Sequence, residues 1–278
     1  MPAPQATMMS QLARLKFTSF ALKVPTNWSD PQGDAGKQYK DAFKDSEKMT
    51  APGAPPLFQP ASMNKYHTDT QKMHIAKIGK FIDDTMKAIA SAWSTWQTAS
   101  TMVGITIAGP VAVGGQIVGP PLTPLILSEA PMSTPGEMKY SNVIAAVIGN
   151  AWLSFTATVK VPGMPWYPAF AACPSPVAPP SPNVPCPFVA LTQVPVSISS
   201  SMMKTQMIAQ LGDPQAPFHK ELFESITDSF EKSYDLWKVS TMVTNVIGTG
   251  PVPTFAPPYV PVGPVLGGIA TMTPGGFT

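Results

Sequence analysis

The chain has 278 residues, a length that allows one or two ordinary domains. Only 12% of the residues are charged, which is about half the usual share, while 34 prolines and 20 glycines make up nearly a fifth of the chain. The net charge is +2 and Arg14 is the only arginine, which excludes direct reading of nucleic acid by arginine side chains. Because 44% of the residues are hydrophobic, a disordered protein is excluded as well.

The N-terminal residues 1–67 are the most polar part of the chain. We expect a short helix or strand over residues 11–22, a polar helix over 38–48 and a proline-rich linker over 50–62. Residues 1–25 lack the continuous apolar segment of a cleaved signal peptide, so synthesis in the cytoplasm is the default expectation.

A long amphipathic helix is predicted to begin near His74. Its apolar residues recur every three or four positions, at Ile75, Ile78, Ile82, Met86, Ile89, Trp93 and Trp96. The chain then becomes uncharged and rich in glycine and proline as far as Leu127. Several prolines interrupt the apolar stretch over residues 102–127, so we expect no membrane span there.

A second helix has a clear start signal. Thr134, Pro135 and Glu137 form the pattern of a capping box with proline at the first helical position. The tail that follows, residues 159–195, holds eleven prolines. Since proline cannot donate to a strand ladder, we expect edge-strand or polyproline-like conformation there.

A third helix is expected to open at Pro217, after a short helix over residues 201–211 that stops at Gly212. Its tail, residues 248–278, carries no charge. We expect this C-terminal arm to stretch across a neighbouring subunit as a clasp, because a charge-free arm folded back on its own chain would leave a bare neutral face.

The three helices and their tails look like copies of one unit. A shift of 59 residues lays Trp93 on Trp152, and a further shift of 82 lays Trp152 on Tyr234. We therefore predict an α+β fold built from three repeats, each an amphipathic helix with a tail that forms an edge strand or a polyproline-like arm. The predicted divisions are an N-terminal segment and linker over 1–67, then repeats over 68–133, 134–199 and 200–278.

Aromatic residues spaced three or four apart lie on the apolar stripe of each helix. Such rings could stack sugars or bases, but their place on the stripe favours a core or an interface. The predicted core or interface residues are Trp93, Trp96, Trp152, Phe155, Phe230, Tyr234 and Trp237.

No catalytic, metal-binding or cofactor-binding residues are predicted. The three histidines, His67, His74 and His219, are far apart and lack neighbouring ligands at metal-site spacing. Cys173 and Cys186 could pair, but free thiols are favoured since no export signal is present. The adjacent carboxylates of Asp83 and Asp84 point in different directions on a helix and are interpreted as solvated charge, and the glycines of 109–119 lack the lysine of a phosphate loop.

The Val-Ile-Gly-Thr-Gly-Pro-Val segment over 246–252, which follows an aromatic-ended helix, resembles accessory structural proteins of tailed phages and phage-like contractile particles. The resemblance covers about residues 74–278. It implies helix-plus-tail units that dock on one another or on the main shell or tail subunits, and it implies no binding residue.

The uncharged segments of the chain also indicate a structural protein. No charge lies between Ala88 and Ser128 or after Lys238, as expected for surfaces that other subunits cover. We expect a non-enzymatic structural component, made in the cytoplasm and mature in a virion or phage-like particle. Its partners would be other copies of itself and other particle proteins. The alternative is a membrane-active or surface-binding protein that uses its neutral tails.

Overall fold

The computed structural model describes residues 3–22, 55–166, 177–191, 198–252, 255–256, 260–261 and 264–278. The chain forms two compact units. One unit consists of Met1–Ser19 and Ile82–Thr278, and the other is Phe20–Phe81. The second unit contains the first part of helix α4. The first contains the rest of α4, the other described helices and the sheet, so the chain combines both element types, in agreement with the predicted α+β class.

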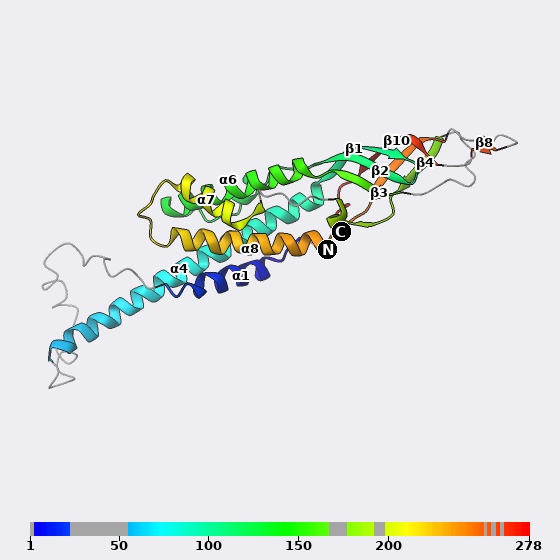
Figure 1. Ribbon diagram of the computed structural model, residues 1–278. Coiled ribbons are helices and arrows are strands. Elements are labelled where there is room, and N and C mark those ends of the chain that lie inside the picture. Colours follow the sequence, from blue (N-terminus) through cyan, green and yellow to red (C-terminus); the bar gives the residue numbers. More distant parts are fainter. Residues whose placement is uncertain are drawn as a thin grey trace. The chain divides into compact units, whose positions relative to one another are not determined.

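The described helices fall into long and short ones (Figure 1). The long helices are α4 (Pro55–Ala99), α6 (Pro135–Thr158) and α8 (His219–Ser240). The short helices are α1 (Ala6–Ser19), α5 (Leu122–Leu127) and α7 (Ser200–Leu211), and a 3-10 turn, η1, spans Phe188–Leu191.

The helix boundaries differ from the expected ones at several points. Residues 55–62 of the expected linker lie in α4, where Pro55 and Pro56 occupy the first turn, whose N–H groups have no helical partner. The expected helix over 38–48 lies outside the described residues. Pro217 lies in the turn before α8, which begins at His219 after Phe218 in the left-handed conformation.

The capping box of α6 is confirmed. The Thr134 hydroxyl accepts a hydrogen bond from the Glu137 backbone N–H at 3.2 Å, and the Glu137 carboxylate accepts one from the Thr134 N–H at 3.0 Å. These bonds satisfy two N–H groups that the helix itself leaves unpaired.

The short helices each connect two of the long ones. Helix α1 packs on α8, and its Arg14 binds Asp83 of α4. Helix α5 packs on α6, and the Glu129 carboxylate just after it accepts a hydrogen bond from Ser91 of α4 at 2.7 Å. Helix α7 packs on both α8 and α6. A short helix therefore lies over each of the three junctions between long helices.

Each long helix ends in the same way and is followed within a few residues by a strand. The N–H group just beyond the helix donates to the carbonyl of the last large aromatic residue, three residues before the helix end. The three bonds are Ser100 to Trp96 at 2.9 Å, Val159 to Phe155 at 3.3 Å and Thr241 to Trp237 at 2.9 Å.

The six-stranded sheet has the order β3-β2-β1-β10-β7-β4, and all neighbours are antiparallel. Its strands are β1 (Thr101–Ala108), β2 (Val111–Val118), β3 (Val161–Pro165), β4 (Val177–Pro182), β7 (Val246–Pro251) and β10 (Leu266–Met272). Two small pairs accompany it: β5 (Cys186–Pro187) with β6 (Met242–Val243), and β8 (Phe255–Ala256) with β9 (Val260–Pro261).

The expectation of edge strands or arms is wrong for the first and third tails. Strands β1, β2, β7 and β10 form the interior of the sheet, whereas β3 and β4 of the proline-rich second tail are its edges. Glycine permits the close pairing of β7 with β10, since a side chain on Gly250 would overlap the backbone of Gly268. The prolines at Pro110 and Pro251 lie at a turn and a strand end, where no interior ladder bond is lost.

The sheet curls so that its buried face closes on itself. A side chain on Gly248 of β7 would overlap Ile107 of β1 and approach Trp166, which follows β3. Beyond the ladders, the Val184 N–H donates to the Pro165 carbonyl at 3.3 Å, which joins the two edges. The buried face is therefore filled by side chains of the sheet itself.

The C-terminal arm belongs to its own chain, so the expected clasp is wrong. Strand β10 lies between β1 and β7, and Phe277 is 3% exposed. Thr278 exchanges two backbone hydrogen bonds with Met242, at 2.7 and 3.0 Å. Pairing with its own hairpin satisfies the arm's backbone groups, so the neutral arm needs no neighbouring subunit for this purpose.

Ending the chain after Ile247 should abolish cooperative unfolding of the first unit. The truncation removes β10 and residues 248–251 of β7, which leaves β1 without its neighbour on that side, and it removes Phe277. Thermal unfolding followed by circular dichroism tests this expectation. A truncated chain that keeps the full-length transition would show that β10 is not part of the folded core.

Candidate functional site

An aromatic cluster lies where the three long helices meet. It contains all seven residues predicted as core or interface, and none of them is more than 2% exposed. Trp93 and Trp96 come from α4, Trp152 and Phe155 from α6, and Phe230, Tyr234 and Trp237 from α8. The closest rings, Trp93 and Trp152, are 4.7 Å apart between centroids with their planes at 62°. This is the edge-to-face geometry that aromatic pairs favour.

The contacts between the three helices follow a cyclic order. The last two aromatic residues of each helix form a pair, and in each junction the second member of one pair contacts the first member of the next. The three contacts are Trp96 with Trp152 at 4.8 Å, Phe155 with Tyr234 at 5.1 Å and Trp237 with Trp93 at 5.5 Å. Each helix therefore has the same relation to its successor at this level.

Three further residues complete the cluster and were not predicted. Phe188 of η1 lies 4.9 Å from Trp237, and Phe277 stacks on Trp96 at 5.8 Å with an interplanar angle of 11°. Gln97 accepts a hydrogen bond from the Trp237 indole N–H and donates to the Phe277 carbonyl, both at 2.9 Å. Phe188 and Phe277 lie in irregular chain, where no hydrophobic period could have identified them.

The histidines and cysteines do not assemble a reactive centre in the described residues. His219 is buried, and its Nδ1 lies 2.5 Å from the Ala216 carbonyl oxygen. No group of three or more metal-ligand residues occurs in the part of the chain that the structure describes. Cys186 is a free buried thiol whose pKa burial raises to about 11. Cys173 and the side chains of His67 and His74 lie outside the described residues.

Asp83 has a structural partner. Arg14 Nε donates to Asp83 Oδ1 at 2.7 Å, and Arg14 Nη2 pairs with the other carboxylate oxygen. This two-point contact is the geometry that arginine favours with a carboxylate. The chain's only arginine thus joins α1 to α4, and Asp83 is one partner of an ion pair.

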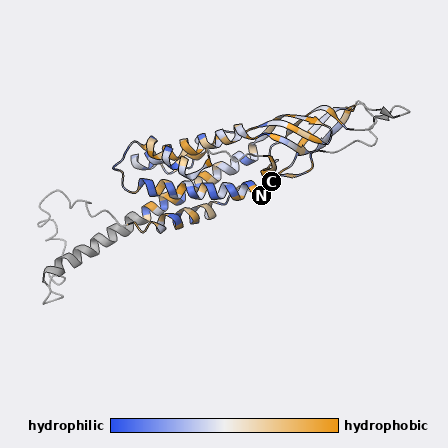
Figure 2. Cartoon of the chain, viewed as in Figure 1, coloured by the Kyte–Doolittle hydropathy of each residue, from blue (hydrophilic) through white to orange (hydrophobic). Residues whose placement is uncertain are grey.

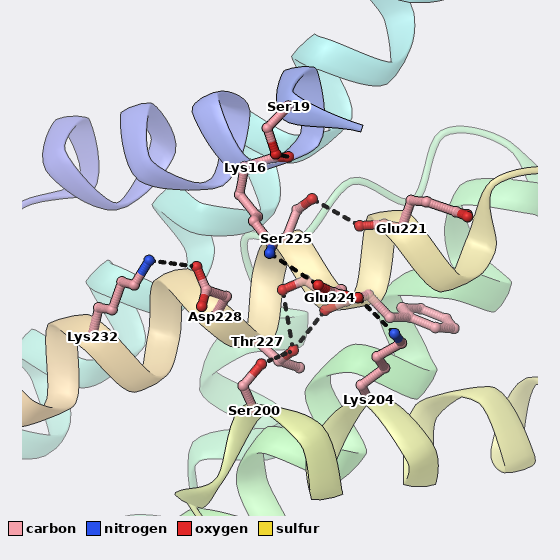
Figure 3. Close-up of polar contacts among 11 residues, drawn as sticks. Lys16, Ser19, Ser200, Lys204, Glu221, Glu224, Ser225, Thr227, Asp228 and Lys232 are labelled. Atoms are coloured by element: carbon pink, nitrogen blue, oxygen red, sulfur yellow. Dashed lines mark hydrogen bonds and ion pairs between the residues drawn. The ribbon is translucent and has the colours of Figure 1, made fainter. Parts of the chain in front are cut away.

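A polar cluster around Glu224 joins α1 and α7 to α8 (Figure 3). The Glu224 carboxylate of α8 lies 3.0 Å from Lys16 Nζ of α1 and 2.6 Å from Lys204 Nζ of α7. The Ser200 and Thr227 hydroxyls, 2.8 Å apart, add a contact between α7 and α8. The hydrogen bonds from Lys204 and Lys16 lower the pKa of Glu224.

The outward-facing side chains of the six-stranded sheet, which we name the outer wall, form the third candidate. No strand of this sheet contains a charged residue. Large apolar side chains of the wall are nevertheless exposed: Val103 39%, Val111 36%, Val118 48%, Leu266 48% and Ile269 72%. Figure 2 shows hydrophilic residues concentrated on the helices and largely missing from these strands. An uncharged surface with several exposed aliphatic side chains is a candidate interaction site.

Trp152→Ala should destabilise the first unit by about 3–5 kcal/mol, because it removes a buried ring that contacts both other long helices. Leu153→Ala is the matched control, since the neighbouring side chain is 66% exposed. Urea unfolding of both variants and the parent measures the difference. Equal unfolding midpoints for the two variants would contradict a core role for the ring.

The parent chain should lose stability relative to Glu224→Gln as the pH falls. The pKa of Glu224 is lowered in the folded state, so its contribution is present above the ordinary value of 4.5 and is lost as the pH drops through the folded value. Melting temperatures of both proteins between neutral and acid pH test this. A difference that stays constant over the whole range would contradict the ion-pair role.

No residue of the described helices lies in a segment with the length and apolar composition that crossing a membrane needs. No family model, curated protein or solved structure matches the chain. The candidate site therefore rests on the geometry described above.

Proposed function

We propose that the chain is a non-enzymatic structural component of a large particle, of the kind formed by virions and phage-like tails. The outer wall is the observation that carries the proposal. It exposes valine, leucine and isoleucine without a charged residue on any strand, next to helices that carry the charges. A surface of this composition is stabilised when other subunits cover it, because apolar burial contributes about 25 cal/mol per Å².

We further propose that the chain consists of three repeats, each a short helix, a long helix and a pair of strands. In this proposal the repeats are α1-α4-β1-β2, α5-α6-β3-β4 and α7-α8-β7-β10. The identical ends of the three long helices and the cyclic order of their ring contacts support it. The positions of the three short helices over successive junctions support it as well.

The strand pairing has the same cyclic order. The first strand of each repeat pairs with the second strand of another repeat: β1 with β10, β7 with β4 and β3 with β2. The first and third repeats also pair internally, as β1-β2 and β7-β10. At the remaining junction, between β3 and β4, the hydrogen bond from Val184 to Pro165 joins the edges. This arrangement supports a pseudo-threefold unit, which suits a particle position of three- or six-fold symmetry.

A membrane-surface role is the second candidate, since the same outer wall could lie on a bilayer. Its composition weakens that candidate. Threonine side chains alternate with the aliphatic ones, as in the row formed by Val113, Thr106, Ile269 and Thr249, so the wall is less apolar than a lipid-embedded face.

Fractionation of the natural source tests the proposal. The chain should cosediment with assembled particles, remain with them through washing at high salt, and give no flotation with phosphatidylcholine vesicles. Apolar contacts resist salt, whereas loose electrostatic attachment does not. Recovery of the chain only in the unassembled fraction, or flotation with the vesicles, would overturn the structural role.

A further inference from the structure

We infer that the outer wall is the docking surface for a partner of threefold or sixfold symmetry that surrounds the sheet. The partner's contact surface would be concave, uncharged and apolar. This inference rests on the proposed structural function and specifies the partner that the wall accepts. It follows from the charge, the curvature and the cyclic arrangement of the wall.

The charge pattern decides which part of the first unit the partner covers. All strands of the sheet are uncharged, and the chain has no charge over residues 161–203 or after Lys238. The helical part, by contrast, carries ion pairs: Lys232 with Asp228 on α8, and Lys139 of α6 with Asp213 in the loop after α7. A partner on the wall therefore buries no charge, whereas one on the helices would have to desolvate several.

The curl of the sheet decides the shape of the partner. Because the buried face closes on itself and the edges are joined by the Val184 to Pro165 bond, the outer wall is the convex side. Two convex walls touch over little area, so a second copy facing the first wall to wall is disfavoured. A concave partner surface can follow the wall over several strands.

The prolines at the edges of the sheet exclude binding by the addition of a partner strand. Strand β3 contains Pro162 and Pro165, and β4 contains Pro179, Pro180 and Pro182. These residues have no N–H to donate to an added strand, and proline on an edge blocks pairing with another chain. The partner therefore contacts side chains of the wall rather than extending the sheet.

The cyclic strand order decides the symmetry. The two strands of each proposed repeat present an exposed aliphatic side chain on the wall: Val118 is 48% exposed on β2, Val177 49% on β4, and Ile269 72% on β10. A partner with three equivalent subunits, or with six, can place one subunit or two against each pair. A single asymmetric partner would use one strand pair and leave the other two exposed to water.

Three single-residue variants and one measurement of the subunit ratio test the inference. Val118→Lys, Val177→Lys and Ile269→Lys each place a charge under one part of the proposed ring. Each should lower incorporation into the particle on the order of tenfold, since an unpaired charge would be buried. Leu15→Lys on α1 is the control, because Leu15 is 69% exposed on a helix outside the wall. It should incorporate normally.

The stoichiometry is measured on the complex that the parent chain forms with its direct neighbour. Native mass spectrometry of the isolated complex should give three or six copies of the neighbouring subunit for each copy of the chain. This measurement does not depend on the variants, whose unfolding midpoints should match that of the parent.

The outcomes separate the inference from the proposed function. A particle that contains the chain with one neighbouring subunit per copy, or in which only one of the three lysine variants is impaired, would overturn the threefold partner and leave the structural role intact. Loss of incorporation by Leu15→Lys to the same degree would overturn the wall as the docking surface. Absence of the parent chain from every particle would overturn both.

Discussion

The packing of three aromatic pairs at the ends of three helices is the constraint on which the rest of the first unit depends. Trp93 and Trp152 contact each other and both contact Trp237, so every long helix touches the other two. Strands β1, β3 and β7 follow the three long helices and begin five, six and nine residues after Trp96, Phe155 and Trp237. The cluster thus fixes where the strands start, and Gln97 connects it to the carbonyl of Phe277 near the end of the chain.

The sheet explains why the tails are rich in glycine and proline and poor in charge. Glycines such as Gly248 and Gly250 leave room for Ile107 and for the facing backbone, so glycine-rich strands occupy the interior. Proline cannot donate within a ladder, so the proline-rich strands occupy the edges. Low charge follows from the same arrangement, because one face is buried against itself and the other is, in our proposal, covered by a partner.

The three proposed repeats connect the fold of the chain with its proposed role. In our proposal, three junctions with corresponding ring contacts and three corresponding strand pairings make one chain a pseudo-trimer. The proposed repeats differ at two points: Phe155 stands in the position that Trp96 and Trp237 occupy in the other two, and the hydrogen bond of Val184 stands where a third internal strand pairing would be. Charges on Glu224 and Asp83 hold the short helices α7 and α1 in place without entering the neutral surface.

The sequence by itself determined the local structure: the α+β class, the three long helices, the capping box at Thr134 and the identity of the large apolar residues on each helix. These follow from hydrophobic periods and from hydrogen bonds between residues three or four apart, which are local properties. The sequence did not determine which tails are interior strands, that the C-terminal arm folds back between β1 and β7, or that Phe188 and Phe277 join the cluster. Those features depend on contacts between residues far apart in the chain, such as Gln97 with Phe277, and only the tertiary structure could decide them.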